Sequence, residues 1–190
     1  MPVPVSDAAT LAAKQAITEN LNNYCRALDR MDRDLALSCW HPGGTDEHTP
    51  LFSGTGADFV DWVFRLHEPM VLTRHVLTNI LIEVDGDEAW SESYWTVLLR
   101  VERDGGIVDI TGGGRYLDHH RAIDGKWGFV HRRSVHDWDR VEPLQGTMAD
   151  FAGVPLLEPT APDAPLYPAT RTKADPSYAA LGRHDLRFPG

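Results

Sequence analysis

The spacing of hydrophobic residues divides the chain into a helical first part and a strand-rich middle part. In the first part, one apolar face recurs at helical spacing: Ile17, Leu21, Tyr24 and Leu28. Ser6 or Asp7 is placed to cap this helix, which we expect to run to about Arg30.

Two shorter helices are predicted after it. Asp32 is placed to cap one over residues 33–39, and the other covers residues 56–68 and ends before a proline. Between them, residues 40–48 contain one proline and two glycines, which break helical structure. We interpret this segment as a polar loop that can close over a cavity.

Beyond residue 70 the period of the pattern changes. Four runs are rich in β-branched and aromatic residues, near 73–84, 88–103, 107–122 and 127–139. Asp-Gly turns separate them, which is typical of hairpins. Three helices followed by four consecutive long strands predict an α+β fold, a curved antiparallel sheet with the helices on its concave side.

The chain changes character again near residue 141. Eight of its 13 prolines follow this point, a composition that cannot build a core alone. We expect one domain over residues 1–140 and a Pro-rich extension over 141–190. Its apolar residues favour an arm that wraps the domain or a neighbouring subunit: Leu156, Leu157, Leu166, Tyr167 and Phe188.

Composition excludes several classes of protein. With 190 residues and 42% hydrophobic content, the chain can bury one substantial core, and its net charge of −10 argues against binding nucleic acid. No signal peptide and no segment of bilayer-spanning length is present, so we expect a cytoplasmic protein that binds no membrane. Cys25 and Cys39 are predicted to be free buried thiols.

One group of residues suggests chemistry. The sequence has no phosphate-binding glycine loop, no Gly-x-Ser-x-Gly turn and no Cys-x-x-Cys. Tyr24 and Asp29 lie at the end of the first helix, and His75 opens the first long strand. An acid paired with an imidazole can move protons without a cofactor. A solvated surface acid and a core histidine are the plain alternatives.

Two sequence stretches resemble a known family. Asn-Tyr-Cys-Arg-Ala-Leu-Asp at 23–29 precedes Arg-His-Val-Leu-Thr-Asn-Ile at 74–80. With the layout of elements, they resemble the SnoaL-like branch of the nuclear transport factor 2 superfamily over roughly residues 8–140. The resemblance implies a cone-shaped fold around a deep apolar cavity. In the dehydratase and dehydrochlorinase members, an aspartate at the end of helix one supports a histidine on the first long strand; Asp29 and His75 occupy these positions, and Tyr24 matches a tyrosine of the bile-acid and scytalone enzymes.

The resemblance and the residues together give a functional hypothesis. His75 would remove a proton while a leaving group, water or formaldehyde, departs from a small hydrophobic, aromatic alcohol. Asp29 would hold the imidazole and Tyr24 would assist the leaving group. A double-bond isomerase with the same dyad, or a non-catalytic binding or assembly module, are the alternatives.

Further residues are candidates for substrate contact. Strand alternation places His75, Leu77, Asn79 and Leu81 on one side of their strand. The full set of substrate-binding candidates is His48, Trp40, Asn79, Trp95, Tyr116 and His136. His136 lies near a position where the bile-acid dehydratase has an arginine, so recognition of a carboxylate or thioester is in doubt.

No cofactor is expected. The spacing of His41, Asp46 and His48 matches no established metal pattern, although a metal site or a second catalytic histidine there remain alternatives to a plain loop. The long strands are too apolar on both faces for a fully wetted outer surface. We therefore expect a homo-oligomer, and the family resemblance puts a trimer ahead of a dimer.

Overall fold

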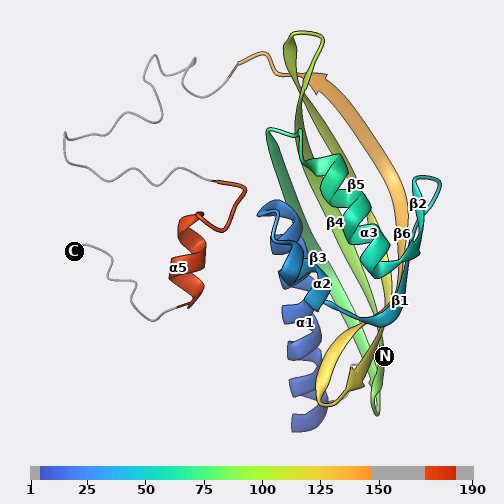
Figure 1. Ribbon diagram of the computed structural model, residues 1–190. Helices are drawn as coiled ribbons and strands as arrows, with labels where there is room; N and C mark the ends of the chain where they lie inside the picture. Colours follow the sequence, from blue (N-terminus) through green and yellow to red (C-terminus); the bar gives the residue numbers. More distant parts are fainter. Residues whose placement is uncertain (1–4, 147–169, 183–190) are drawn as a thin grey trace.

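The computed structural model describes residues 5–146 and 170–182 (Figure 1). The elements in chain order are α1 (Ala8–Asp29), α2 (Arg33–Ser38), β1 (Trp40–His48), β2 (Phe52–Thr55), α3 (Gly56–His67), β3 (Leu72–Asp85), β4 (Glu88–Arg103), β5 (Gly106–Ile123), β6 (Lys126–Pro143) and α5 (Pro176–Gly182). The three expected helices and the four long strands are all present, with ends within a few residues of those predicted.

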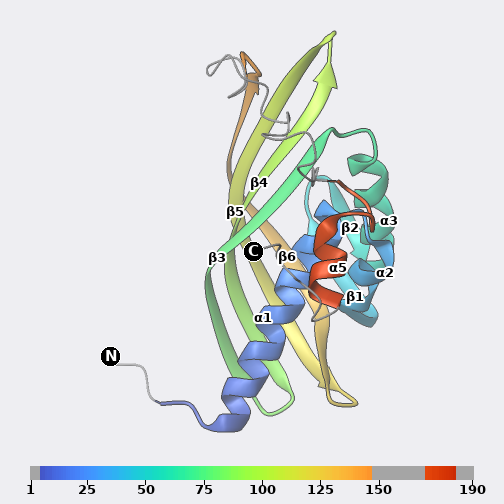
Figure 2. The same cartoon turned by 90° about the vertical axis from the view of Figure 1, so that its left-hand side faces the viewer.

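The six strands form one curved sheet in the order β2-β1-β6-β5-β4-β3. Strands β3 to β6 are successive antiparallel neighbours, as the Asp-Gly turns predicted. Figure 2 shows the sheet in profile, with α1, α2 and α3 together on its concave side. The α+β cone architecture is therefore confirmed.

The segment from Trp40 to His48 differs from the prediction. It forms β1, which pairs in parallel with β6 and antiparallel with β2, so the sheet is mixed. Its pairing with β6 is interrupted between Trp40 and Thr45, and Gly43 there has φ of 81°. This irregularity accommodates the proline and glycines without ending the strand. The loop interpretation and the purely antiparallel sheet were wrong.

The first helix sets the positions of both candidate groups on it. Asp7 caps α1, its Oδ1 accepting from the amide of Thr10 at 2.7 Å. Tyr24 lies on the buried face with no exposed surface. Five residues turn a helix by about 500°, so Asp29 points about 140° away from Tyr24 around the axis. The two side chains consequently serve different regions of the fold.

The interior of the cone is more polar than the expected apolar cavity. Aromatic residues dominate it, but Arg132, Asp118, Asp46 and His120 are also almost fully buried there. Cys25 and Cys39 are free buried thiols, as predicted. Burial raises the pKa of each thiol to about 12, so neither is a reactive nucleophile near neutral pH.

The described part of the C-terminal extension contacts the helical side of the domain. Tyr178 in α5 donates its hydroxyl hydrogen to Asp32 at 2.8 Å, and the guanidinium of Arg26 lies 4.3 Å from the centre of the Tyr178 ring. The sequence did not predict this helix. The five apolar residues expected to anchor a wrapping arm lie outside the described residues. No helix among those described is both long and apolar enough to cross a membrane.

Candidate active site

Asp29 and His75 are joined by two hydrogen bonds. The ring Nδ1 of His75 lies 2.6 Å from Oδ1 of Asp29, and the backbone amide of His75 donates to Oδ2 at 2.9 Å. One carboxylate therefore fixes both the strand and the ring. Because the Asp29 carboxylate accepts the hydrogen of Nδ1–H, the His75 ring takes the tautomer in which Nε2 carries the lone pair.

A pocket of about 260 Å³ opens onto this pair, between the C-terminal half of α1 and strand β3. We call it the seam pocket; its lining residues are Asn22, Cys25, Arg26, Asp29, Arg30, His75 and Leu77. The His75 side chain is 8% exposed and that of Asp29 is 14% exposed. The imidazole is therefore largely shielded from bulk water but still reachable by a small molecule.

A second histidine lies beside His75. The ring of His67, at the end of α3, is centred 5.7 Å from the ring of His75. Burial, with smaller contributions from His75 and Arg171, lowers the pKa of His67 to about 3. His67 thus stays neutral and adds no positive charge beside the dyad.

Tyr24 does not contact the dyad. Its ring lies among Phe59, Tyr116 and Phe129, with centroid distances of 6.5, 6.2 and 5.8 Å. Its hydroxyl is buried and has no hydrogen-bond partner within the described residues. Burial, together with the neighbouring Tyr116, raises the pKa of Tyr24 well above its ordinary value. The structure therefore places this hydroxyl in the interior of the cone and away from the seam pocket.

The interior is centred on a buried ion pair. Arg132 donates from Nε and Nη2 to the two carboxylate oxygens of Asp118, each at 2.7 Å, and both side chains are fully buried. The guanidinium lies 4.0–4.2 Å from the ring centres of Tyr24, Tyr116 and Phe129. Burial opposes its charge, but Asp118 holds the pKa of Arg132 above its usual value. Its Nη1 has no partner among the described residues.

A third group lies beside the turn between β1 and β2. A pocket of about 300 Å³, here called the turn pocket, is lined by His48, Thr49, Pro50, Leu51, Trp95, Ser134 and His136. It gathers three of the predicted substrate-binding residues, and a fourth, Tyr116, stacks against Trp95 at 5.9 Å. The side chain of His136 is 54% exposed and pairs with Asp139 at 3.4 Å.

The remaining two predicted substrate residues, Trp40 and Asn79, lie away from both pockets. Trp40 is buried against Phe129, with ring centres 5.0 Å apart, as part of the core. Asn79 is exposed and has φ of 49° at an irregularity in the β3–β4 pairing. Because this bulge reverses the alternation, Asn79 and Leu81 leave the side that His75 and Leu77 occupy. The prediction that these four residues share one side was wrong.

The three candidate metal ligands do not converge. His41 donates from Nε2 to the carbonyl of Arg121 at 2.8 Å, whereas Asp46 pairs with His48. Over residues 5–146 and 170–182, no group of three or more histidine, cysteine, aspartate or glutamate side chains is arranged to hold a metal ion.

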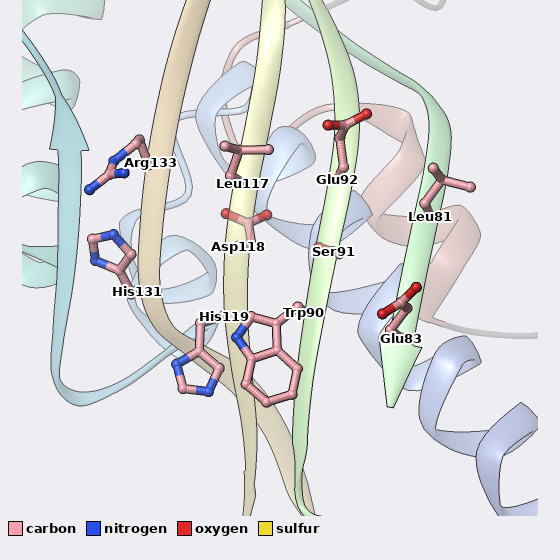
Figure 3. A pocket seen from close by; sticks show the side chains of 10 residues that line it. All are labelled: Leu81, Glu83, Trp90, Ser91, Glu92, Leu117, Asp118, His119, His131 and Arg133. Atoms are coloured by element: carbon pink, nitrogen blue, oxygen red, sulfur yellow. The ribbon is translucent and has the colours of Figure 1, made fainter. Parts of the chain in front are cut away.

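A larger hollow, about 660 Å³, lies elsewhere, on the outer face of the sheet (Figure 3). The stacked rings of Trp90 and His119 lie at one end of it, and Glu92, His131 and Arg133 lie around it. None of its histidines is held by a buried carboxylate, and the hollow is open to solvent. The hollow therefore offers no imidazole oriented in the way that Asp29 orients His75, and its size alone does not make it the active site.

Sequence reasoning missed three groups near these sites. In the sequence, His67 looks like an ordinary polar residue at the end of a helix. Arg132 looks like one of two surface arginines at 132–133, although strand alternation would have placed one of the two inside. Arg171 lies in the extension, where its guanidinium contacts the carbonyl of Met70 and the sulfur of Met31. No local pattern could have predicted that contact.

The family is established by sequence. The profile of the SnoaL-like domain family matches residues 9–133, about two thirds of the chain. The chain therefore belongs to the SnoaL-like domain family, and the predicted resemblance is confirmed. No match was found among proteins of curated function.

Solved structures share the fold. A putative scytalone dehydratase from Novosphingobium aromaticivorans is 24% identical, with a TM-score of 0.62 over 69% of this chain and 88% of that one. A hexachlorocyclohexane dehydrochlorinase, LinA type 2, is 21% identical, with a TM-score of 0.64 over 75% and 95%. A Mycobacterium tuberculosis protein of unknown function, Rv3472, is 26% identical, with a TM-score of 0.59 over 68% and 74%.

Proposed function

We propose that this protein is a cofactor-independent lyase in which His75 is the base. The observation that carries the proposal is the double hydrogen bond from Asp29 to the ring and backbone of His75. A carboxylate in this position orients the imidazole and stabilises its cation once a proton has been taken. General acid–base help of this kind is worth roughly 10²–10⁴-fold in rate.

The proposed reaction needs only one oriented imidazole. Nε2 of His75 would remove a C–H proton, the electron pair would form a double bond, and the β-hydroxyl would leave as water after taking the proton back from Nε2. In the formaldehyde-releasing variant, Nε2 would take the proton of a hydroxymethyl group, the carbon–carbon bond would break, and the same proton would return to carbon. Tyr24 would take part only with a substrate long enough to reach the cone interior.

The substrate class follows from size and polarity. A pocket of about 260 Å³ lined by Cys25 and Leu77 as well as polar groups suits a small alcohol with some apolar surface. Aromatic residues dominate the cone interior rather than this lining, so they favour an aromatic substrate that is long enough to reach that interior. The names of two proteins of this fold, a dehydratase and a dehydrochlorinase, both denote eliminations and support the same class.

One observation favours a second function. Nε2 of His75, oriented by Asp29, could return the abstracted proton to a different carbon of the same substrate, and the neutral ring of His67 beside it adds no competing charge. A dyad with such a neighbour would serve a double-bond isomerase, which returns the proton to a different carbon of the same substrate.

A product assay separates these possibilities. The full chain would be incubated with a panel of aromatic β-hydroxy ketones and hydroxymethyl compounds, with and without a chelator, and products identified by mass. We expect loss of water or formaldehyde, unaffected by the chelator and abolished in His75→Ala. A product of unchanged mass would indicate the isomerase, and no turnover of any compound would favour a non-catalytic binding module.

A further inference from the structure

A second histidine–aspartate pair lies on β1, apart from Asp29 and His75. Nδ1 of His48 is 2.5 Å from Oδ1 of Asp46. The Asp46 side chain is fully buried, and that of His48 is 18% exposed. As at His75, a carboxylate accepting from Nδ1–H leaves Nε2 with the lone pair.

The His48 ring is also held on its faces. It stacks on Phe59, with ring centres 4.5 Å apart and an interplanar angle of 19°. It also makes a T-shaped contact with Tyr116, with ring centres 5.8 Å apart. Asp46 holds Nδ1, and within the described residues no hydrogen bond occupies Nε2. Because the ring lines the turn pocket, this nitrogen is an oriented acceptor available to a ligand there.

The rest of the turn pocket is mainly apolar. Trp95 supplies an indole wall, and Pro50 and Leu51 close the side formed by the β1–β2 turn. No lysine or arginine lines the pocket, and the buried Asp46 lies directly behind the imidazole. An anionic ligand such as a carboxylate would find no lysine or arginine to pair with and a negative charge nearby, and His136 in the lining already pairs with Asp139, so a neutral donor fits better.

We propose that the turn pocket binds a neutral aromatic ring that carries a hydroxyl group. The hydroxyl donates to Nε2 of His48, and the ring lies against Trp95. A volume of about 300 Å³ suits a single substituted ring. Aromatic stacking adds affinity beyond that of the buried area alone. A phenolic hydroxyl satisfies the acceptor better than an aliphatic one because it is the stronger donor.

This binding site is independent of the proposed lyase reaction. None of the residues that line the turn pocket also lines the seam pocket. Binding can therefore be measured without turnover, and a failure of the lyase proposal would leave this one standing.

The test compares three probes by protein-observed NMR titration of the full chain: 4-cyanophenol, benzonitrile and benzoate. We expect 4-cyanophenol to bind about tenfold more tightly than benzonitrile, equivalent to about 1.4 kcal/mol, and to perturb the Trp95 indole signal. Benzoate should bind more weakly than 4-cyanophenol. Equal affinity of the phenol and benzonitrile, or stronger binding of benzoate, in the wild-type protein would overturn the proposal without any variant.

Variants locate the site. His48→Phe should remove the preference for the hydroxyl, and Asp46→Asn should weaken it by releasing the ring. His131→Phe is the matched control, since His131, on the neighbouring strand β6, hydrogen-bonds Thr45 on the outer side of β1 at 2.9 Å. His75→Asn should also bind the phenol normally. A preference retained in both His48→Phe and Asp46→Asn, or lost in His75→Asn, would contradict the assignment.

Discussion

At the scale of single residues, carboxylates decide which histidines can act. Of nine histidines in the chain, His75 and His48 each line a pocket and are each oriented by an aspartate that is largely shielded from solvent, whereas the aspartate beside His136 is exposed. His67 and His120 are instead buried without a carboxylate on the ring, and burial lowers the pKa of His120 to about 4. These two are held neutral, so they affect stability rather than proton transfer near neutral pH.

The lowered pKa of His67 predicts that the fold loses stability in acid. His67 has a folded-state pKa of about 3 against an ordinary value near 6.5, so the unfolded chain binds more protons between these pH values. Its neutral form supports folding fully above about pH 6.5, and that stability falls as the pH drops toward 3, by at most about 1.4 kcal/mol per pH unit. Urea unfolding at pH 7.5 and pH 5 should show this loss.

His67→Phe should make the unfolding free energy less dependent on pH in that range. His131→Phe, a change of a partly exposed histidine, should leave the dependence as in the wild type. An identical slope in the His67 variant and the wild type would contradict the role assigned to burial.

At this scale, the sequence predicted contacts correctly where both residues lie in helices or strands that were themselves predicted correctly. Asp29 and His75 meet because a helix end and a strand start are brought together, as the family resemblance implied. The Asp46–His48 pair was not predicted, because residues 40–48 were interpreted as a loop. In a strand, alternate residues lie on one side, so Asp46 and His48 would have been expected to face the same way. Asn79 was misplaced because a bulge leaves no reliable signal in a single sequence.

At the scale of elements, the glycine run in β5 shapes the turn pocket. A Cβ on Gly114 would lie 2.0 Å from the carbonyl oxygen of Val135 and 2.7 Å from Cζ2 of Trp95. The bare backbone therefore lets the indole lie flat against the strand. Gly113, on the other face, gives the same room to Trp138, at 2.5 Å from its Nε1.

Gly114→Ala should consequently destabilise the fold by about 1–3 kcal/mol through overpacking and displace Trp95. Urea unfolding and the near-ultraviolet circular dichroism of the tryptophans would both detect it. Gly106→Ala in the same strand is the control, because its Cβ would meet nothing closer than 3.8 Å. Equal stability of the two variants would show that the strand can shift to make room.

The described C-terminal segment, residues 170–182, acts as a further element. Its contacts fall near the end of α1 that carries Asp29: Asp175 lies 3.5 Å from Arg30, and Lys173 lies 3.1 Å from Asp32. Truncation after residue 146 should lower the melting temperature, since these contacts and the buried area under Tyr178 are lost. Lys173→Ala alone should change it little, because solvent screens the ion pairs of an exposed lysine. An unchanged melting temperature on truncation would contradict a wrapping role.

At the scale of the whole molecule, the outer face of the sheet exposes several large apolar side chains among its charged ones. On β4, Trp95 points inward, so its alternates Trp90 and Tyr94 point out and are 50% and 42% exposed. On the neighbouring β3, Leu81 is 66% exposed. We propose that a second copy of the chain covers this face, giving a homo-oligomer with a trimer ahead of a dimer.

Trp90→Glu should then shift the sedimentation of the protein toward the monomer at micromolar concentration. Leu11→Glu is the matched control, since Leu11 is 56% exposed on α1, on the opposite side of the sheet. A wild-type protein that sediments as a monomer would refute the oligomer outright.

The central claim is that Asp29 makes His75 the catalytic base, and Asp29→Asn tests it most directly. Turnover of the best substrate from the product assay would be measured in this variant and in Asp61→Asn, a surface aspartate paired only with Arg33 among the described residues. We predict that kcat falls about 10²–10⁴-fold in Asp29→Asn, with an unchanged fold, and stays near the wild-type value in Asp61→Asn. A folded Asp29→Asn protein that turns over within about twofold of the wild type would contradict the claim.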